Sequence, residues 1–197
     1  MPEGTLKPQD VFIACQLAIA GKANVTHAWL SKSLHLSPST VFEGLKRCRQ
    51  AKLVSDSAPR GSEREVKVMR SRLYEFLVHA VPVLYYPRRS APVRGIATAT
   101  FSPAFRERFT KPGDLIMVWP YSKGKEIGEG LVPIYPTVPI ACSKSPALYE
   151  LMATIEVLRV GKAREKAAAE AYLENLLLPA SGFRAATAVE HSDDEAA

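Results

Sequence analysis

The strongest constraint on this fold lies between residues 26 and 50, where a leucine pattern, a Ser-Pro pair and a run of hydroxyl side chains predict two short helices joined by a tight turn. Ser37 has the side chain of a helix N-cap, and Pro38 occupies the first helical position, where its missing N–H leaves no hydrogen bond unmade. The apolar positions keep helical spacing on one side of both helices: Leu30, Leu34, Leu36, Val41 and Leu45. We therefore expect the second helix to span residues 37–50 and to turn its other side to solvent.

That outer side carries side chains suited to a DNA groove. Small hydroxyl residues, Ser39 and Thr40, stand at its N-terminus, and the charged residues Glu43, Lys46 and Arg47 follow further along. A helix with this pattern fits the major groove of a duplex, where its side chains reach the base edges.

The runs Leu-Ser-Pro-Ser-Thr-Val at 36–41 and Ala-Lys-Leu-Val at 51–54 resemble the winged helix-turn-helix of bacterial transcriptional regulators, MarR-like members included. The resemblance covers roughly the first third of the chain. The sequence departs from that pattern at His35, where glycine is usual in the turn, and at Ser31, where alanine is usual. Histidine tolerates a left-handed backbone better than most residues. Gly44 weakens the second helix by about 1 kcal/mol relative to alanine. A plain three-helix bundle and a winged helix that binds protein are the alternatives.

Residues 52–55 and 66–68 are predicted as two short strands, with the turn residues Ala-Pro-Arg-Gly-Ser at 58–62 between them. This pattern predicts a wing with Arg60 near its tip, within reach of the DNA backbone or a minor groove. The alternative extends the following helix backward to Arg64, because Val66 and Met69 also fit helical spacing with Leu73.

The net charge of +6 fits a polyanionic partner, and its distribution is more informative than its size. Basic residues follow or flank the predicted recognition helix: Lys46, Arg47, Arg49, Lys52, Arg60, Arg64, Lys67, Arg70 and Arg72. Glu63, Glu65 and Glu75 dilute this patch, and a charged face that is merely solvated is the alternative.

No enzyme is predicted, because the chain has no phosphate-binding loop, no histidines at metal-ligand spacing and no nucleophile elbow. The cysteines, Cys15, Cys48 and Cys142, are odd in number and widely spaced, which argues against disulfides and zinc. We expect no cofactor. The start lacks a signal peptide and the apolar segment 11–20 is too short for a membrane span, so a cytoplasmic protein without membrane contact is expected.

A first helix is expected from Pro8 to about Gly21, and its apolar residues occupy more than one stripe. A helix that is apolar on most sides must be buried on most sides. A helix-turn-helix domain covers only one face, so either the second domain or another subunit must cover the other. A homodimer is preferred here, because two-fold regulators read two half-sites.

A small mixed sheet packed on helices is expected from residue 81 onward. Three apolar runs associated with proline are predicted as strands: 81–87, 115–120 and 131–136, the last at a sheet edge. Residues 88–95 are expected to form a basic, irregular loop. Ser145, followed by proline, repeats the earlier cap and opens a helix that Gly161 ends, and a further helix runs from 162 to 178. Residues 179–197 have little to bury, end acidic and are expected to be disordered.

Together these features predict an α+β fold with three parts. A winged helix-turn-helix DNA-binding domain spans 1–80, a small mixed α/β region ending in two helices spans 81–178 for dimerisation or sensing, and an acidic tail follows at 179–197. The expected function is a regulator, dimeric and specific for a double-stranded DNA sequence. Ser39, Thr40, Glu43 and Arg47 would lie nearest the bases, and Ser37, Lys46, Arg60 and Arg64 would hold the backbone. The alternative is an antitoxin-like or adaptor protein that uses its winged-helix fold and residues 81–178 to bind another protein.

Overall fold

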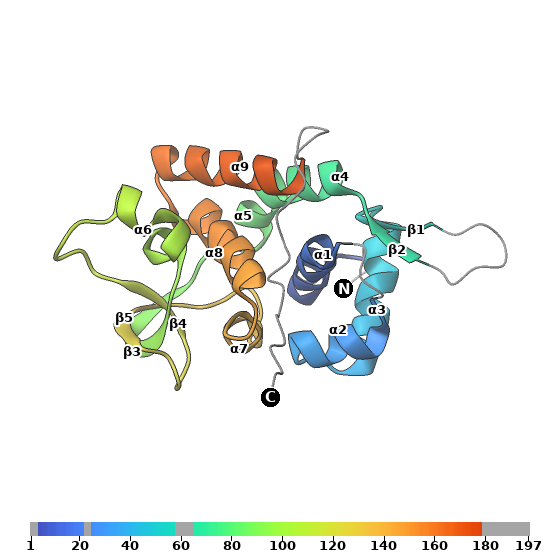
Figure 1. Cartoon of the computed structure of the whole chain (residues 1–197), viewed down its shortest axis with the longest axis horizontal. Helices are drawn as coiled ribbons and strands as arrows, with labels where there is room; N and C mark the ends of the chain where they lie inside the picture. The colour runs from blue at the N-terminus through green and yellow to red at the C-terminus, as the bar shows by residue number, and fades with distance from the viewer. Residues whose placement is uncertain (1–3, 22–24, 58–64, 179–197) are drawn as a thin grey trace, which may run out of the picture.

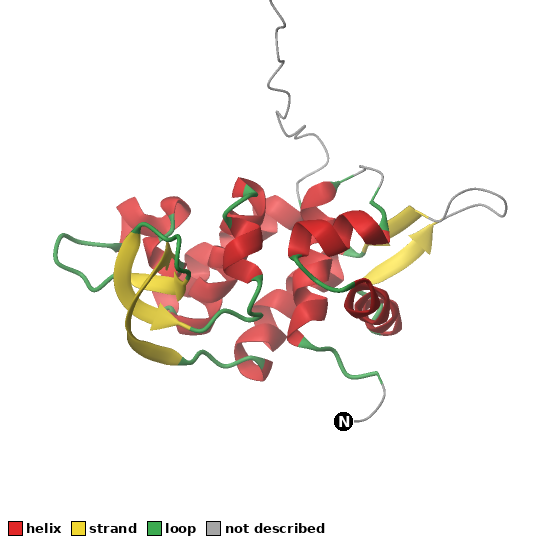
Figure 2. Ribbon diagram, turned by 90° about the horizontal axis from the view of Figure 1, so that it is seen from below, coloured by secondary structure: helices red, strands yellow, loops and turns green. Residues whose placement is uncertain are grey.

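The computed structural model describes residues 4–21, 25–57 and 65–178. The fold is mixed α+β, as the sequence predicts at this level: two small sheets stand at opposite ends of the molecule, and helices fill the space between them (Figure 1, Figure 2). No helix in these residues is long and apolar enough to cross a membrane. The tail at 179–197, expected to be disordered, lies outside the described residues.

The N-terminal third consists of three helices and a hairpin: α1 (Pro8–Ala20), α2 (His27–Leu34), α3 (Pro38–Gln50), β1 (Val54–Ser57) and β2 (Glu65–Val68). The strands β1 and β2 pair antiparallel, from Val54 opposite Val68 to Ser57 opposite Glu65. The predicted helices and strands of this region are confirmed. The alternative of a helix reaching back to Arg64 is wrong, because β2 occupies residues 65–68.

The chain continues as helix where a strand was predicted at 81–87. Helix α4 (Arg70–Glu75) runs into a π-helical turn, η1 (Phe76–Ala80), and then into α5 (Val81–Leu84). Pro82 has no N–H, and in a regular α-helix its ring would clash with the carbonyl four residues earlier. In the wider turn the Val81 N–H donates to the Phe76 carbonyl, and the helix continues through Pro82.

The second sheet is a closed barrel of β3 (Arg89–Ala97), β4 (Met117–Pro120) and β5 (Glu126–Leu131). Strand β3 pairs antiparallel with β4 and with β5, and β4 and β5 are parallel. The predicted strand at 115–120 is confirmed as β4. The predicted loop at 88–95 is wrong, because β3 occupies most of it; this strand tolerates Pro92 because its pairing with β5 is irregular there.

The strand predicted at 131–136 is also wrong. Only Leu131 belongs to a strand, and the following segment is irregular because Pro133 and Pro136 have no N–H to pair. The true strand lies earlier and contains two glycines. Closure of so small a barrel brings backbones together, and a Cβ on Gly128 would overlap the Ile116 carbonyl.

The remaining elements are helical: η2 (Ala99–Phe101), α6 (Pro103–Phe109), α7 (Val138–Cys142), α8 (Pro146–Val160) and α9 (Ala163–Leu177). The two predicted C-terminal helices are confirmed, as are the residues predicted to begin and end the first of them. At the start of α8 the Ser145 Oγ accepts the Leu148 N–H at 3.3 Å, and Gly161 follows its last residue.

Helix α8 covers the second face of α1. Every residue of α1 from Asp10 to Ala18 is buried, by α2 and α3 on one side and by α8 on another. The apolar excess of this helix therefore needs no second subunit, and of the two alternatives the one in which the second domain covers α1 is confirmed. Buried side chains before and after residue 80 belong to one continuous core, so the two expected domains share it.

A buried ionic network joins α8 to the barrel. The Trp119 Nε1 donates to Glu156 at 3.1 Å, and Glu156 pairs with Arg159 one turn further along α8. Arg159 also donates to the carbonyls of Tyr85 at 2.7 Å and Tyr86 at 3.2 Å. Burial raises the pKa of Glu156, and the Arg159 charge opposes that shift.

Candidate nucleic-acid interface

Local hydrogen bonds set the turn between α2 and α3. At the start of α2 the Thr26 Oγ1 accepts the Trp29 N–H at 3.1 Å. His35 ends α2 in the left-handed region, with φ 53° and ψ 44°, as its position in the turn requires. The Ser37 Oγ accepts the Thr40 N–H at 3.1 Å, so the predicted N-cap of α3 is confirmed.

The outer side of α3 is polar near its N-terminus. Ser37, Ser39, Glu43 and Lys46 are exposed, and Thr40 is half-buried. The Ser37 hydroxyl lies 3.0 Å from that of Ser39 and 2.8 Å from that of Thr40. These residues lie together at one end of the molecule, where α3 stands between α2 and the β1/β2 hairpin (Figure 1).

Arg47 does not lie on this outer side. Its Nε and one terminal nitrogen donate to the Asp10 carboxylate at 2.6 and 2.8 Å. The Asp10 side chain is fully buried, and only 12% of the Arg47 side chain is exposed. Hydrogen bonding to Asp10 raises the pKa of Arg47. The prediction that Arg47 stands next to the bases is wrong, because residue 47 follows Gly44 by three positions, on the flank of α3 that α1 covers.

Gly44 makes this close contact between the two helices feasible. A Cβ at that position would lie 2.5 Å from the Ile13 Cδ1 and 2.9 Å from the Asp10 Oδ1. Asp10 was not predicted from the sequence, although one signal was present: it is the only charged residue of a largely apolar helix, and it lies in the first turn. There Asp10 also accepts the Lys7 N–H at 2.8 Å, which caps α1.

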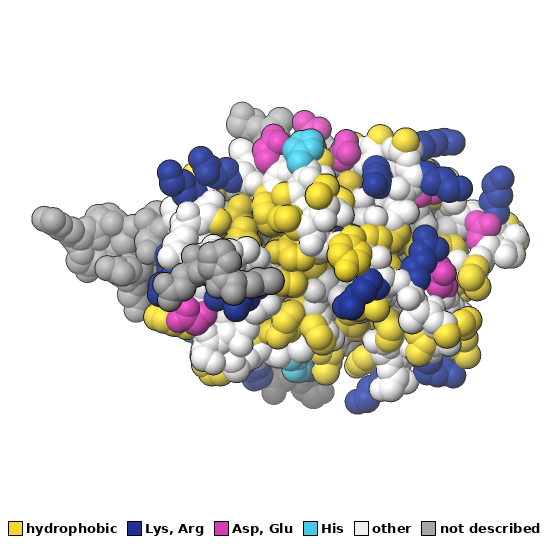
Figure 3. Space-filling view, turned by 180° about the vertical axis from the view of Figure 1, so that it is seen from behind, with side chains coloured by type: hydrophobic (Ala, Val, Ile, Leu, Met, Phe, Trp, Pro, Cys, Tyr) yellow, Lys and Arg dark blue, Asp and Glu magenta, His cyan; other side chains and the backbone are white. Residues whose placement is uncertain are grey.

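Only some of the basic residues that follow α3 lie in the part of the chain that the structure describes. Arg60 and Arg64 lie outside the described residues. Lys52 before β1 and Lys67 on β2 are exposed. Arg70 has an internal role, since it donates to the Ala18 carbonyl at 2.8 Å near the end of α1. In Figure 3, Lys and Arg side chains stand at both ends of the face, at the hairpin end on the left and at the barrel end on the right, with hydrophobic side chains between them.

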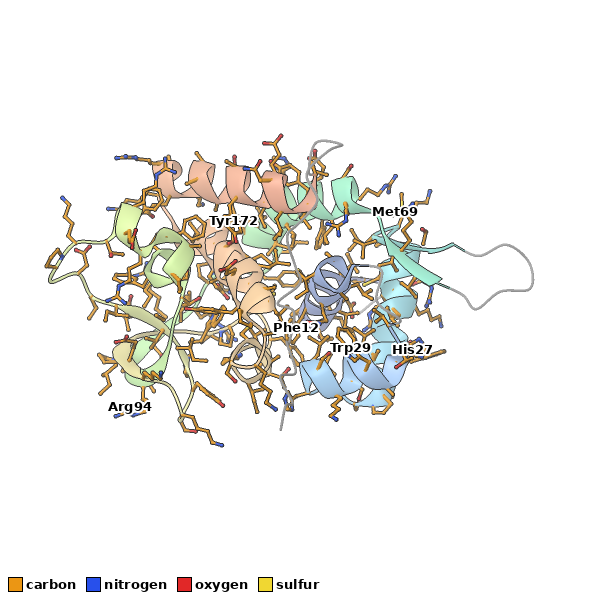
Figure 4. The ribbon with its side chains drawn as sticks, viewed as in Figure 1. Phe12, His27, Trp29, Met69, Arg94 and Tyr172 are labelled. Carbon is orange, nitrogen blue, oxygen red and sulfur yellow. The ribbon has the colours of Figure 1, made fainter. Side chains whose placement is uncertain are left out.

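Exposed aromatic side chains stand beside the polar residues of α3. These aromatic residues were not predicted from the sequence as part of the interface. Phe42 on α3 is 55% exposed, and its ring meets that of His27 edge-on with centroids 6.2 Å apart. Trp29 on α2 is 39% exposed. In Figure 4, His27 and Trp29 lie on α2 at this end, whereas Arg94 lies at the opposite end, on the barrel.

One cavity lies away from this surface, and a second borders it at Trp29. One of about 550 Å³ lies beside the barrel and is lined in part by Tyr121 and Arg106. Another of about 480 Å³ is lined by Gln16 of α1, Trp29 of α2 and Lys144 before α8. Within the described ranges, no cluster of His, Cys, Asp or Glu side chains is arranged to hold a metal ion.

Comparison with known proteins adds no relative: no protein-family model, no curated protein and no solved structure matches this chain.

Proposed function

We propose that the segment from α1 to β2 is a winged helix-turn-helix that places α3 in the major groove of double-stranded DNA, and that the protein is a sequence-specific transcriptional regulator. One observation carries the proposal. Helix α3 packs its inner side on α1 and leaves a capped, polar N-terminal face exposed between α2 and the hairpin. This is the arrangement in which a recognition helix reaches base edges.

The DNA contacts proposed here differ from those that the sequence predicted. Ser39 and Glu43 are the exposed polar residues near the N-terminus of α3 and would lie nearest the bases. Ser37 and Thr40 stand at the positive end of the helix dipole, where a phosphate is favoured. Lys46 would contact a phosphate beside the groove. Arg47 has no base contact in this proposal, because Asp10 holds it.

The test is fluorescence anisotropy of the full chain with its own upstream DNA and with scrambled DNA, over a series of salt concentrations. A specific regulator should prefer the native sequence by about a hundredfold or more. Lys46→Gln should weaken binding to both and reduce the slope of log K against log salt by about 1. Lys123→Gln, an exposed lysine of the barrel end, is the matched control and should change neither quantity. The opposite pattern would move the interface to the barrel.

The proposal includes two copies of the chain on one operator, as two half-sites would require. Sedimentation of the protein with a saturating duplex measures this stoichiometry directly. A single copy on the duplex would remove the dimer and leave the groove contact intact.

A second candidate, an adaptor that binds another protein, is favoured by one exposed patch. Val83 and Leu84 of α5 and the nearby Tyr86 are 75%, 58% and 69% exposed. Adjacent exposed apolar side chains of this size are typical of protein interaction sites. Absence of DNA binding at low salt, together with a stable hetero-complex that Leu84→Ser disrupts, would favour this function over the first.

A further inference from the structure

Phe42 is the apolar exception on the exposed side of α3. It stands between Ser39 and Lys46 on that side, next to Glu43, and it is 55% exposed. The contact with His27 limits the positions that its ring can take. An aromatic ring that is more than half exposed is stabilised when an apolar group of a partner covers it.

Neither arginine of α3 stands among the exposed residues of the helix. Arg47 is bound to Asp10 through two hydrogen bonds. Arg49 is half-buried and engaged within the chain. An arginine that donates to both O6 and N7 is the commonest specific contact to guanine. The outer side of α3 therefore offers no arginine for reading guanine, and Lys46 is its exposed basic residue.

The apolar group that a base pair presents in the major groove is the C5-methyl of thymine, which phenylalanine can contact. We propose that Phe42 reads thymine through this methyl group, so that the bound sequence carries a thymine opposite the middle of α3. The inference rests on the proposed function, since it names the base that the same surface recognises. The thymine methyl would cover part of the exposed ring, and the His27 edge would hold the ring in place.

The experiment first selects bound duplexes from a random pool with the full chain. Each thymine of the selected site is then replaced singly by deoxyuridine, which removes only the methyl group. At one thymine per bound copy, replacement by deoxyuridine should weaken binding about fourfold, which is the effect of one buried methyl group. The other thymines should show no change.

Protein variants then assign the effect to Phe42. With Phe42→Ala, the thymine and deoxyuridine duplexes should bind equally, and both more weakly than the wild type binds thymine. Lys46→Gln should bind more weakly and keep the fourfold preference. Ile127→Ala removes an apolar side chain that is 63% exposed at the barrel end and should behave as the wild type. Circular dichroism checks that each variant is folded.

Two results overturn this inference and leave the proposed function standing: equal binding of thymine and deoxyuridine duplexes by the wild type, or a preference that survives in Phe42→Ala. Failure to select any duplex overturns both this inference and the proposed function. In that case the salt series also shows no preference for the native sequence, whereas in the first two results that preference remains.

Discussion

The ion pair between Asp10 and Arg47 provides the sharpest test of how this structure is held together. Asp10→Ala removes two charge-assisted hydrogen bonds, of 2.6 and 2.8 Å, and leaves the partly buried Arg47 charge without its partner. It also removes the oxygen that accepts the Lys7 N–H. Breaking one side of a buried pair costs about 3–5 kcal/mol. We expect a loss of this size in the free energy of unfolding, measured by urea denaturation with circular dichroism.

A double-mutant cycle separates the pair from its surroundings. Arg47→Ala should also be costly, because it leaves a fully buried carboxylate, but Asp10→Ala with Arg47→Ala should cost little more than the worse single variant. Arg89→Ala is the control, since it breaks an ion pair whose arginine is 53% exposed, and it should cost less than about 1 kcal/mol. A loss below about 1 kcal/mol for Asp10→Ala, or strict additivity in the double variant, would refute the reasoning.

Three further outcomes are expected. Gly44→Ala gains about 1 kcal/mol of helix propensity but places its Cβ 2.5 Å from the Ile13 Cδ1, so we expect a net loss of about 1–2 kcal/mol in the free energy of unfolding, measured in urea. A stabilised variant would show that the Ile13 and Asp10 side chains move aside at little cost. Burial raises the pKa of Glu156 above 4.5, so its contribution is present below that pH and is lost as the pH rises through the raised pKa. The unfolding free energy of the wild type relative to Glu156→Gln should therefore fall as the pH rises above about 4.5, and a rise would contradict the assignment. Burial raises the pKa of Cys48 to about 12, so an aromatic disulfide reagent should label this thiol only after unfolding, and labelling of the native protein at pH 8 would contradict its burial.

The helices with strong end signals could be predicted from the sequence. Ser37 and Ser145 cap α3 and α8 as expected, and His35 takes the left-handed conformation that the turn requires. Each of these interactions joins residues only a few positions apart, so a short stretch of sequence contains both partners.

Strand positions in the second half could not be predicted in the same way. Strand β3 contains Pro92 and β5 contains Gly128 and Gly130, residues that normally indicate loops. They are tolerated because of where the neighbouring backbone lies: the pairing is irregular beside Pro92, and the Ile116 carbonyl leaves no room for a side chain at Gly128. Only the closed barrel makes these residues suitable for strands.

The candidate interface likewise has features that could be predicted from the sequence and features that could not. The sequence by itself determined the turn, the cap and the exposed polar residues of α3, because helical periodicity decides which side of a helix is apolar. Only the tertiary structure decided that Arg47 is bound to Asp10, 37 residues earlier, and that α8 covers α1. The periodicity of one helix shows which positions share a face, but the partner of that face comes from another part of the chain, and its position depends on the packing of the whole core.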